Sequence, residues 1–116
     1  MNLVDFFKAL SDETRLRIIN LLLNVSYLRV RDIVEVLQLP QSTVSRHLAM
    51  LKRLGWVEDK RVDIWVHYRL NRRLNHSLLS ALKELFTHHL VFQNDVNRLQ
   101  HRESFGTGGT AQESNG

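Results

Sequence analysis

The spacing of apolar residues changes twice along this chain and divides it into helical segments and one pair of short strands. Up to about Leu54, apolar residues recur every three or four positions, which is the period of a helix with one buried face. Between Trp56 and Leu70, apolar and polar residues alternate instead, as they do in strands. Helical spacing then returns and runs from about Asn75 to about Arg102. The chain is therefore predicted to form four helices, a hairpin and one long final helix.

The first three predicted helices differ in how much of their surface is apolar. Residues 3–10 form a short helix that is apolar on most of its surface, which favours a central position or coverage by a partner. Ser11 or Asp12 is expected to cap the second helix, which runs to about Val25, and a third helix spans 29–37. The residues of these two helices that are predicted to be buried are Leu16, Ile19, Leu22, Leu23, Ile33, Val34 and Leu37.

The fourth predicted helix, within residues 39–54 (LPQSTVSRHLAMLKRL), carries the clearest functional signal. At about 100° per residue, one side holds Val44, Leu48, Leu51 and Leu54. The opposite side holds Ser42, Ser45, Arg46, Ala49 and Arg53, and the helix contains no carboxylate. A solvated helix usually mixes charge signs, so this face is typical of a helix that lies against phosphates and base edges. An ordinary amphipathic surface helix is the alternative.

Two short strands are predicted after this helix, at 57–61 and 64–70. Alternation puts Ile64, Val66, Tyr68 and Leu70 on one face of the second strand, and Trp65, His67 and Arg69 on the other. A helix–turn–helix with a basic second helix, followed by such a hairpin, is a winged helix-turn-helix. The predicted fold class is therefore mainly α with a small β-hairpin, in the order α-α-α-α-β-β-α.

The net charge of +4 is concentrated in one part of the chain. Residues 1–40 carry five basic and five acidic residues, and residues 74–116 carry three basic and four acidic ones. Residues 41–73, in contrast, carry eight basic residues against three acidic ones. A nucleic-acid footprint concentrates positive charge in this way, whereas a generally basic protein would spread it.

Length and composition limit the number of domains and exclude several classes of function. The 116 residues are expected to form one domain, with 1–103 folded and 104–116, which lack an apolar period, disordered. No apolar run approaches the roughly 20 residues that span a membrane and no signal-peptide layout is present, so a cytoplasmic protein without membrane binding is expected.

The absence of cysteine excludes thiolate metal sites and a Cys nucleophile. No catalytic motif stands out, so an enzyme is not expected.

Three separated motifs agree in order and spacing with one known family. Residues 7–18, FKALSDETRLRI, are similar to a signature of roughly LADPTRLRIL, and residues 41–48, QSTVSRHL, match a recognition helix. Residues 66–70, VHYRL, resemble a second wing strand. Over about residues 3–100 the chain thus resembles the ArsR/SmtB family of bacterial repressors. The resemblance implies a homodimer, paired through its first and last helices, that binds an inverted repeat in double-stranded DNA and leaves it when an effector arrives.

The last predicted helix supports a dimer independently of that resemblance. Residues recur there at alternating spacings of four and three, in the pattern of a heptad stripe: Leu78, Leu82, Leu85, His89, Phe92, Val96 and Leu99. A small domain cannot easily cover so much apolar helix, so a second copy is expected to cover it; packing within the chain is the alternative. The predicted dimer interface comprises Leu3, Phe6, Phe7, Leu78, Leu82, Leu85, His89, Phe92 and Val96.

The predicted DNA contacts follow from position on the fourth helix and the hairpin. Arg46 is expected to bind guanine O6 and N7, a contact that discriminates by about 1–3 kcal/mol, and Thr43 to touch a thymine methyl. His47 is expected to pack rather than to contact bases. Gln41 and Ser42, in the first turn, are expected to meet a phosphate. The complete predicted set is Gln41, Ser42, Thr43, Ser45, Arg46, Lys52, Arg53, Lys60 and Arg61, of which the last four are also assigned to backbone phosphates.

The wing tip departs from the pattern of the resembling family. That tip is usually Gly-Arg, whereas the aligned residues here are Asp63 and Ile64. An arginine inserted into the minor groove is therefore not available at the tip. Lys60 and Arg61 are expected to contact phosphates in its place.

The metal sites of the resembling family are also altered. Its thiolate sensors carry Cys-Val-Cys where this chain has Arg29-Val30-Arg31, and arginine repels a cation. A second family site, Asp-x-His with His-x-x-Glu, falls on Arg72, Leu74, Leu85 and His88, of which only His88 is a ligand type. No cofactor or metal is therefore expected.

Two functional hypotheses remain after these exclusions. The first is a repressor that is released by an effector not bound through thiols, with His88 and His89 as weak metal candidates and a small organic molecule as the other option. The alternative is a constitutive or partner-controlled DNA-binding protein with no small-ligand site.

Overall fold

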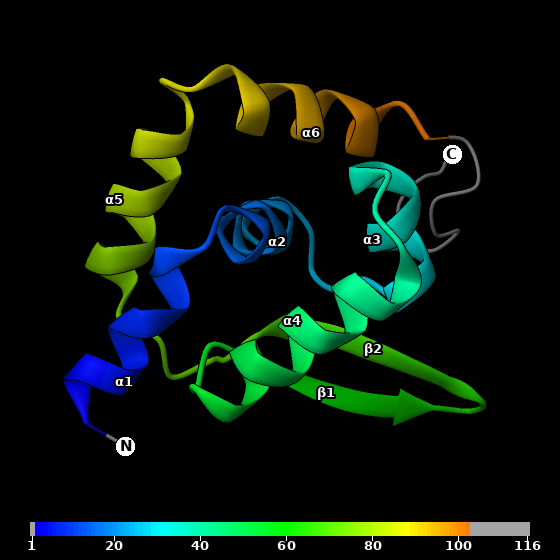
Figure 1. The fold of residues 1–116 in the computed structure, drawn as a ribbon, viewed down its shortest axis with the longest axis horizontal. Helices are drawn as coiled ribbons and strands as arrows, with labels where there is room; N and C mark the ends of the chain where they lie inside the picture. Colours follow the sequence, from blue (N-terminus) through cyan, green and yellow to red (C-terminus); the bar gives the residue numbers. More distant parts are fainter. Residues whose placement is uncertain (1, 103–116) are drawn as a thin grey trace.

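Helix α2, Glu13–Asn24, lies at the centre of the fold, with the other elements arranged around it (Figure 1). The structure is a computed structural model, and it describes residues 2–102. The remaining elements are α1 (Leu3–Lys8), a 3-10 turn (Ala9–Ser11), α3 (Val30–Leu37), α4 (Gln41–Arg53), β1 (Val57–Val62), β2 (Trp65–Leu70), α5 (His76–Phe86) and α6 (Leu90–Gln100). The predicted tail 104–116 and the end of the predicted domain at 103 lie outside the described residues.

The predicted fold class is confirmed, with one helix more than expected. The chain is mostly helical and has a two-stranded antiparallel hairpin after α4, so it is a winged helix-turn-helix. Asp12 caps α2, as one of the two predicted candidates, because its carboxylate accepts the backbone N–H of Arg15 at 3.1 Å. Across residues 2–102, no helix is both long and apolar enough to cross a membrane.

The buried face of α2 is wider than its sequence spacing predicted. Ile18, Ile19 and Leu21 are fully buried, whereas the predicted Leu16 is only half-buried. The reason is that α2 packs against α4 on one side and against α5 and α6 on others, so that no single stripe faces the core. Val34 of α3, also predicted to be buried, is half-buried as well.

Trp56 joins α1 to the start of the hairpin. Its indole is fully buried, stacks on the ring of Phe6 at 4.5 Å, and donates a hydrogen bond from Nε1 to the Phe6 carbonyl oxygen at 2.8 Å. A buried indole N–H needs such a partner, and this one fixes α1 beside the C-terminal end of α4.

The hairpin is close to the prediction but its turn is shifted. Val57 pairs with Leu70 and Val62 with Trp65, which leaves Asp63 and Ile64 as a two-residue turn. Ile64, predicted as the first residue of the second strand, lies in this turn instead and is 75% exposed. Asp63 adopts a φ of 59°, a conformation that Asp tolerates better than most residues other than Gly. The loop residue Leu28 adds a short bridge to β2, donating to and accepting from Tyr68 at 2.9 and 2.8 Å.

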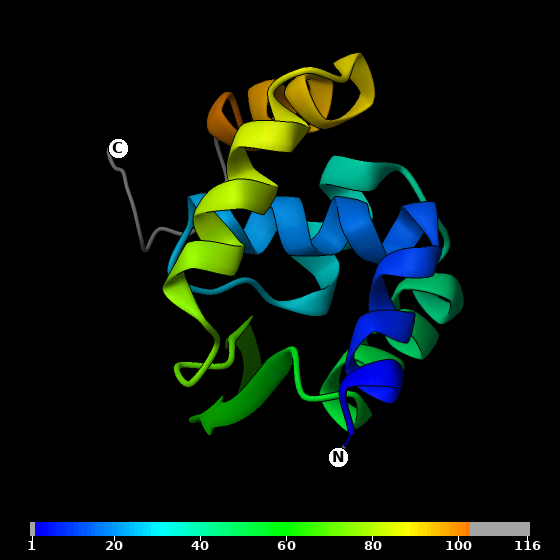
Figure 2. The same cartoon turned by 90° about the vertical axis from the view of Figure 1, so that its left-hand side faces the viewer.

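The prediction of one long last helix is wrong, because α5 ends at Phe86 and α6 begins at Leu90. The intervening residues form a turn, and His89 is extended with a φ of −131°. Helix α6 turns away from α5 and runs across α2 (Figure 2). Phe92 and Leu99 are consequently buried inside the protomer, so this half of the stripe follows the alternative of packing within the chain.

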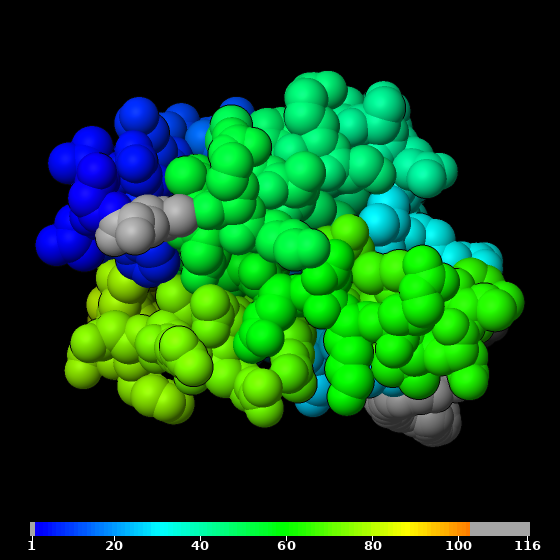
Figure 3. Space-filling model, turned by 90° about the horizontal axis from the view of Figure 1, so that it is seen from below, coloured from blue at the N-terminus to red at the C-terminus, as the bar shows by residue number. Residues whose placement is uncertain are grey.

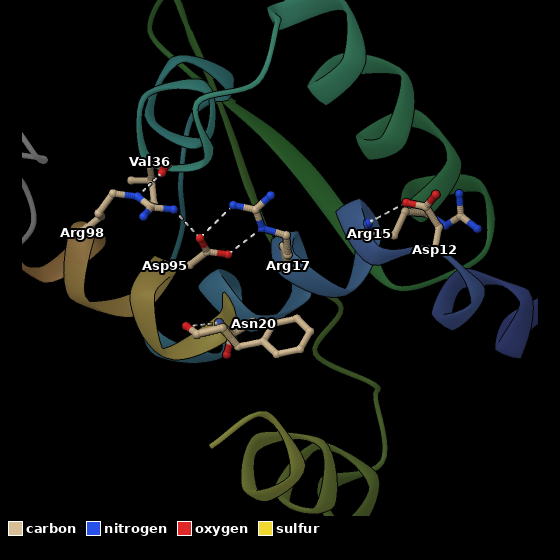
Figure 4. A network of polar contacts seen from close by, with 8 residues as sticks. Asp12, Arg15, Arg17, Asn20, Val36, Asp95 and Arg98 are labelled. Atoms are coloured by element: carbon tan, nitrogen blue, oxygen red, sulfur yellow. Dashed lines mark hydrogen bonds and ion pairs between the residues drawn. The ribbon is translucent and has the colours of Figure 1, made fainter. Parts of the chain in front are cut away.

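A buried carboxylate holds α6 in this position (Figure 4). Asp95 is fully buried and accepts hydrogen bonds from Nε and an amino group of Arg17 on α2 at 2.8 and 2.9 Å. Arg98 also donates to Asp95, and its Nε donates to the Val36 carbonyl oxygen of α3 at 2.7 Å. The hydrogen bond with Asp95 raises the pKa of Arg17 despite partial burial. Helix α6 therefore connects the central helix to the helix that precedes α4.

Candidate nucleic-acid interface

Helix α4 has the two faces that the sequence predicted. Val44, Leu48 and Leu51 are fully buried against the core. The opposite face exposes its hydroxyl and guanidinium groups together with small Ala49, and it contains no carboxylate: Ser42, Ser45, Arg46 and Arg53. A helix with this burial pattern presents short donors and cations to any surface that approaches it.

The turn before α4 is built by local sequence. Gln38 ends α3 in the left-handed conformation, with a φ of 60°, and its N–H donates to the Val34 carbonyl oxygen. Pro40 then precedes α4, and the first helical bond runs from the Val44 N–H to its carbonyl oxygen at 3.1 Å. The backbone N–H groups of the first turn thus have no partner within the helix, and exposed Gln41 and Ser42 lie there.

Most of the predicted DNA-contacting residues are accessible. Thr43 is half-buried, and all the others are exposed: Gln41, Ser42, Ser45, Arg46, Lys52, Arg53, Lys60 and Arg61. They lie on α4 and the hairpin, which are adjacent on one face of the molecule (Figure 3). The structure therefore brings most of these side chains close together, on two neighbouring elements.

The hairpin register separates two of the predicted phosphate contacts. Lys60 is opposite His67 and Arg61 is opposite Val66, so the two cations point to opposite faces of the wing. Arg61 shares its face with Asp59, whose carboxylate pairs with Lys52 of α4 at 3.0 Å. Arg61 therefore lies on the side of the wing that faces α4. The Lys52 pair is solvent-exposed, and such pairs are weak enough to exchange for a phosphate.

A basic cluster at the base of the wing was missed by the residue-level prediction. The carboxylate of Glu58 accepts the backbone N–H of Arg72 at 3.0 Å and lies 3.8 and 3.7 Å from Nε of Arg69 and Arg72. The Arg72 N–H and the charges of Arg69, Arg72 and Arg73 lower the pKa of Glu58. The Arg72-Arg73 pair lies in the basic segment of the sequence, and that excess of charge was the available signal.

His47 packs behind the exposed face of α4, as expected. Its side chain is 13% exposed, with Nδ1 3.7 Å from a carboxylate oxygen of Asp12 and 3.4 Å from an amino nitrogen of Arg15. Burial lowers the pKa of His47; Asp12 opposes this effect, and Arg15 and Arg46 add to it. The positive charge of this region therefore extends behind the face that holds Arg46.

The positions at which the family binds metals are occupied differently here. Arg29 lies 4.7 Å from the centroid of the Trp65 ring, and it shares an ion pair with Asp32 at 3.4 Å. Burial alone would raise the pKa of Asp32, but the Arg29 N–H and the guanidinium groups of Arg102 and Arg29 lower it overall. His88 and His89 are exposed at the break between α5 and α6. Within residues 2–102 no group of three or more His, Cys, Asp or Glu side chains is arranged to hold a metal ion.

The predicted dimer-interface residues divide into three groups by burial. Leu3, Phe7, Leu85 and His89 are exposed; Phe6, Leu78 and Val96 are half-buried; Leu82 and Phe92 are buried in the protomer. The exposed fractions of Leu3, Phe7 and Leu85 are 71%, 44% and 57%. A hollow of about 480 Å³ beside Leu3 and Phe7 is lined by three apolar residues of α1, by Leu74 and Leu78 around the start of α5, and by Gly55, Asn71, Arg73 and Asn75. The accessible part of the predicted interface is therefore α1 with α5.

Comparison with known proteins assigns this fold to a family. Residues 12–59, which contain α2, α3, α4 and the start of β1, match the model of the arsR family of bacterial regulatory proteins. HlyU from Vibrio cholerae N16961 is 31% identical with a TM-score of 0.63, over 75% of this chain and 90% of that one. The chain belongs to the ArsR family. The transcriptional repressor PagR of Bacillus anthracis is similar too, at 30% identity and a TM-score of 0.61, over 71% of this chain and 90% of that one.

The family model matches the segment that contains α4 and ends before α5 and α6. This ArsR-family chain is 44% identical over 68 residues to the arsenical resistance operon repressor of Escherichia coli K12. That match spans 59% of this chain and 58% of the repressor. Members of the family are transcriptional regulators rather than enzymes, in agreement with the prediction that no catalytic site is present.

Proposed function

We propose that this chain is a transcriptional repressor that binds an inverted repeat in double-stranded DNA as a homodimer and is released by an effector not held by thiolates. The observation that carries the proposal is the carboxylate-free face of α4. Ser42, Ser45 and Arg46 are exposed there, directly opposite a row of fully buried Val44 and Leu48. Arg46 is assigned to a guanine, and the exposed cations of α4 and the wing to phosphates.

The dimer is supported by apolar surface that the chain leaves uncovered on one side. Leu3 and Val4 of α1 are 71% and 69% exposed, and Leu85 of α5 is 57% exposed. A second copy is the occupant we assign to this surface, because two-fold symmetry would then present α4 twice to successive turns of one duplex. Phe92 and Leu99 are left out of this interface, since they fill the protomer's own core.

The effector class follows from the chemistry of the chain. Soft metals and metalloids prefer thiolates, and the sequence has no cysteine. Arg29 and Arg31 occupy the positions at which the thiolate sensors of the family carry their ligands. An effector of this chain must therefore be bound through oxygen, nitrogen or apolar contacts.

The proposal is tested by selecting duplexes from a random library with the full chain and measuring the mass of the complex. Enriched duplexes should contain an inverted repeat with half-sites about 10 base pairs apart, or a multiple of that spacing, and should bind two chains. Ser45→Glu, which places a carboxylate on the exposed face, should abolish enrichment while the protein stays folded. Phe7→Glu should give a monomer that selects no inverted repeat. Enrichment of no motif, or of the same motif by Ser45→Glu, would contradict the proposal.

A further inference from the structure

A cavity lies between the C-terminal end of α1 and the C-terminal half of α4. Its volume is about 450 Å³. It is lined by Asp5, Lys8, Ser11, Arg15, Met50, Arg53 and Leu54. Three of these residues are cations and one is a carboxylate, whereas the hollow beside α1 and α5 is mainly apolar.

The guanidinium of Arg15 is buried and hydrogen-bonded to neutral acceptors. Arg15 is 9% exposed, and its Nε donates to the Ala9 carbonyl oxygen at 3.1 Å while an amino group donates to the Lys8 carbonyl oxygen at 3.1 Å. The other amino group faces Nδ1 of His47 at 3.4 Å. Among residues 2–102, no carboxylate oxygen is within ion-pair distance of this guanidinium. Neutral acceptors satisfy its hydrogens, and the three cations that line the cavity outnumber its one carboxylate, so the lining carries a net positive charge.

The other two cations of the cavity are available to a ligand. Arg53 is exposed, and its side chain has no hydrogen bond or ion pair with any described residue. Among residues 2–102, the ammonium of Lys8 pairs with Asp5 alone, one turn earlier on α1, at 3.4 Å with both groups largely in solvent. Such a pair contributes little and exchanges readily for a stronger anion.

We propose that this α1–α4 cavity binds a phosphate-type oxyanion, held by Lys8 and Arg53 at the rim in the field of Arg15. The inference deepens the proposed function and rests on it for its biological meaning, because a ligand here touches α1 and α4 together. Helix α1 belongs to the surface assigned to the second copy, and α4 to the surface assigned to DNA. The same chemistry has two sources, a free oxyanion acting as an effector and a phosphate of the DNA backbone.

The test is calorimetric titration of the full chain with inorganic phosphate at constant ionic strength. Wild type and the control Lys83→Gln, an exposed cation on α5, should bind phosphate equally. Arg53→Gln and Lys8→Gln should each weaken binding by about tenfold, since each removes a charge-assisted hydrogen bond. Both residues are exposed, so circular dichroism should show unchanged folding; Arg53→Lys should recover part of the affinity. Absence of phosphate binding by wild type, or equal affinity of all variants, would overturn the proposal.

A second arm separates the two sources of the anion. If a backbone phosphate fills the cavity, added phosphate should compete with the duplex, and Lys8→Gln should lower DNA affinity and reduce the salt slope by about one. If a free oxyanion fills it, Lys8→Gln, which removes no predicted DNA contact, should bind DNA like wild type without phosphate and lose only the response to phosphate. A chain that selects inverted repeats but binds no phosphate would refute the cavity and leave the proposed function standing. A chain that binds phosphate but selects no duplex would refute the proposed function and leave the phosphate site in the cavity standing.

Discussion

Helix α4 and the α5–α6 segment carry equally regular apolar patterns, but only α4 follows its pattern throughout. In α4 the spacing identified the buried residues, because one unbroken helix lies on the core along one face. In the C-terminal segment the stripe continues through His89 although the helix does not. Apolar spacing therefore shows which side of a helix is buried, but it does not show whether one helix or two carry that side.

The break between α5 and α6 costs little in backbone hydrogen bonding. The N–H groups of Thr87, His88 and His89 bond to the carbonyl oxygens three residues earlier, so none of them is lost to the turn. In return, the chain buries Phe92 and Leu99, and each such side chain contributes about 1.5–3 kcal/mol. The distant partner Arg17, 78 residues before Asp95, then fixes where α6 lies.

The sharpest way to separate two helices from one is a pair of proline substitutions. Ala81→Pro, in the interior of α5, should cost about 3 kcal/mol or more, because it removes a helical hydrogen bond and introduces a clash. Leu90→Pro falls on the first residue of α6, after an extended His89, where proline is tolerated, and should cost less than about 1 kcal/mol. Urea unfolding measures both. Equal costs would mean that the helix is continuous.

Replacing the buried carboxylate tests what holds α6 in place. Asp95→Asn should lower the free energy of unfolding by about 2–3 kcal/mol, below the full cost of breaking a buried pair because Arg17 and Arg98 reach some solvent. Glu84→Gln, at an exposed position of α5, serves as the control and should change stability by less than about 0.5 kcal/mol. If Asp95→Asn lowers the free energy of unfolding no more than the control does, Asp95 does not hold α6 in place.

A smaller effect is expected from His47, behind α4. Its pKa is lowered, first by burial and then by Arg15 and Arg46, so the folded state favours the neutral ring. The stability that this provides is present above the ordinary pKa of 6.5 and is lost as the pH falls through the lowered value. Unfolding free energy should therefore fall more steeply below pH 6.5 in wild type than in His47→Gln. Identical slopes would contradict this assignment.

The sequence predicted the features of this structure that depend on neighbouring residues better than those that depend on contacts between distant residues. The faces of α4, the capping Asp12 and the hairpin follow from neighbouring residues, and the predicted cations of α4 and the wing are all exposed. Ile64 was misplaced because a two-residue turn began one position later than the alternation suggested. The burial of Arg15 could not be predicted, since it depends on how the end of α1 folds back beside α4.

The central claim is that α4 distinguishes base sequence while the surrounding cations bind any duplex. It is tested most directly by titrating wild type, Arg46→Ala and Lys60→Ala against the selected inverted repeat and a scrambled duplex at two salt concentrations. Arg46→Ala should lose about 1–3 kcal/mol of the difference between the two duplexes and keep most of its affinity for the scrambled one. Lys60→Ala should weaken both duplexes equally and lower the salt slope by about one. The reverse pattern, with Arg46→Ala weakening both duplexes alike and Lys60→Ala losing sequence preference, would contradict the account.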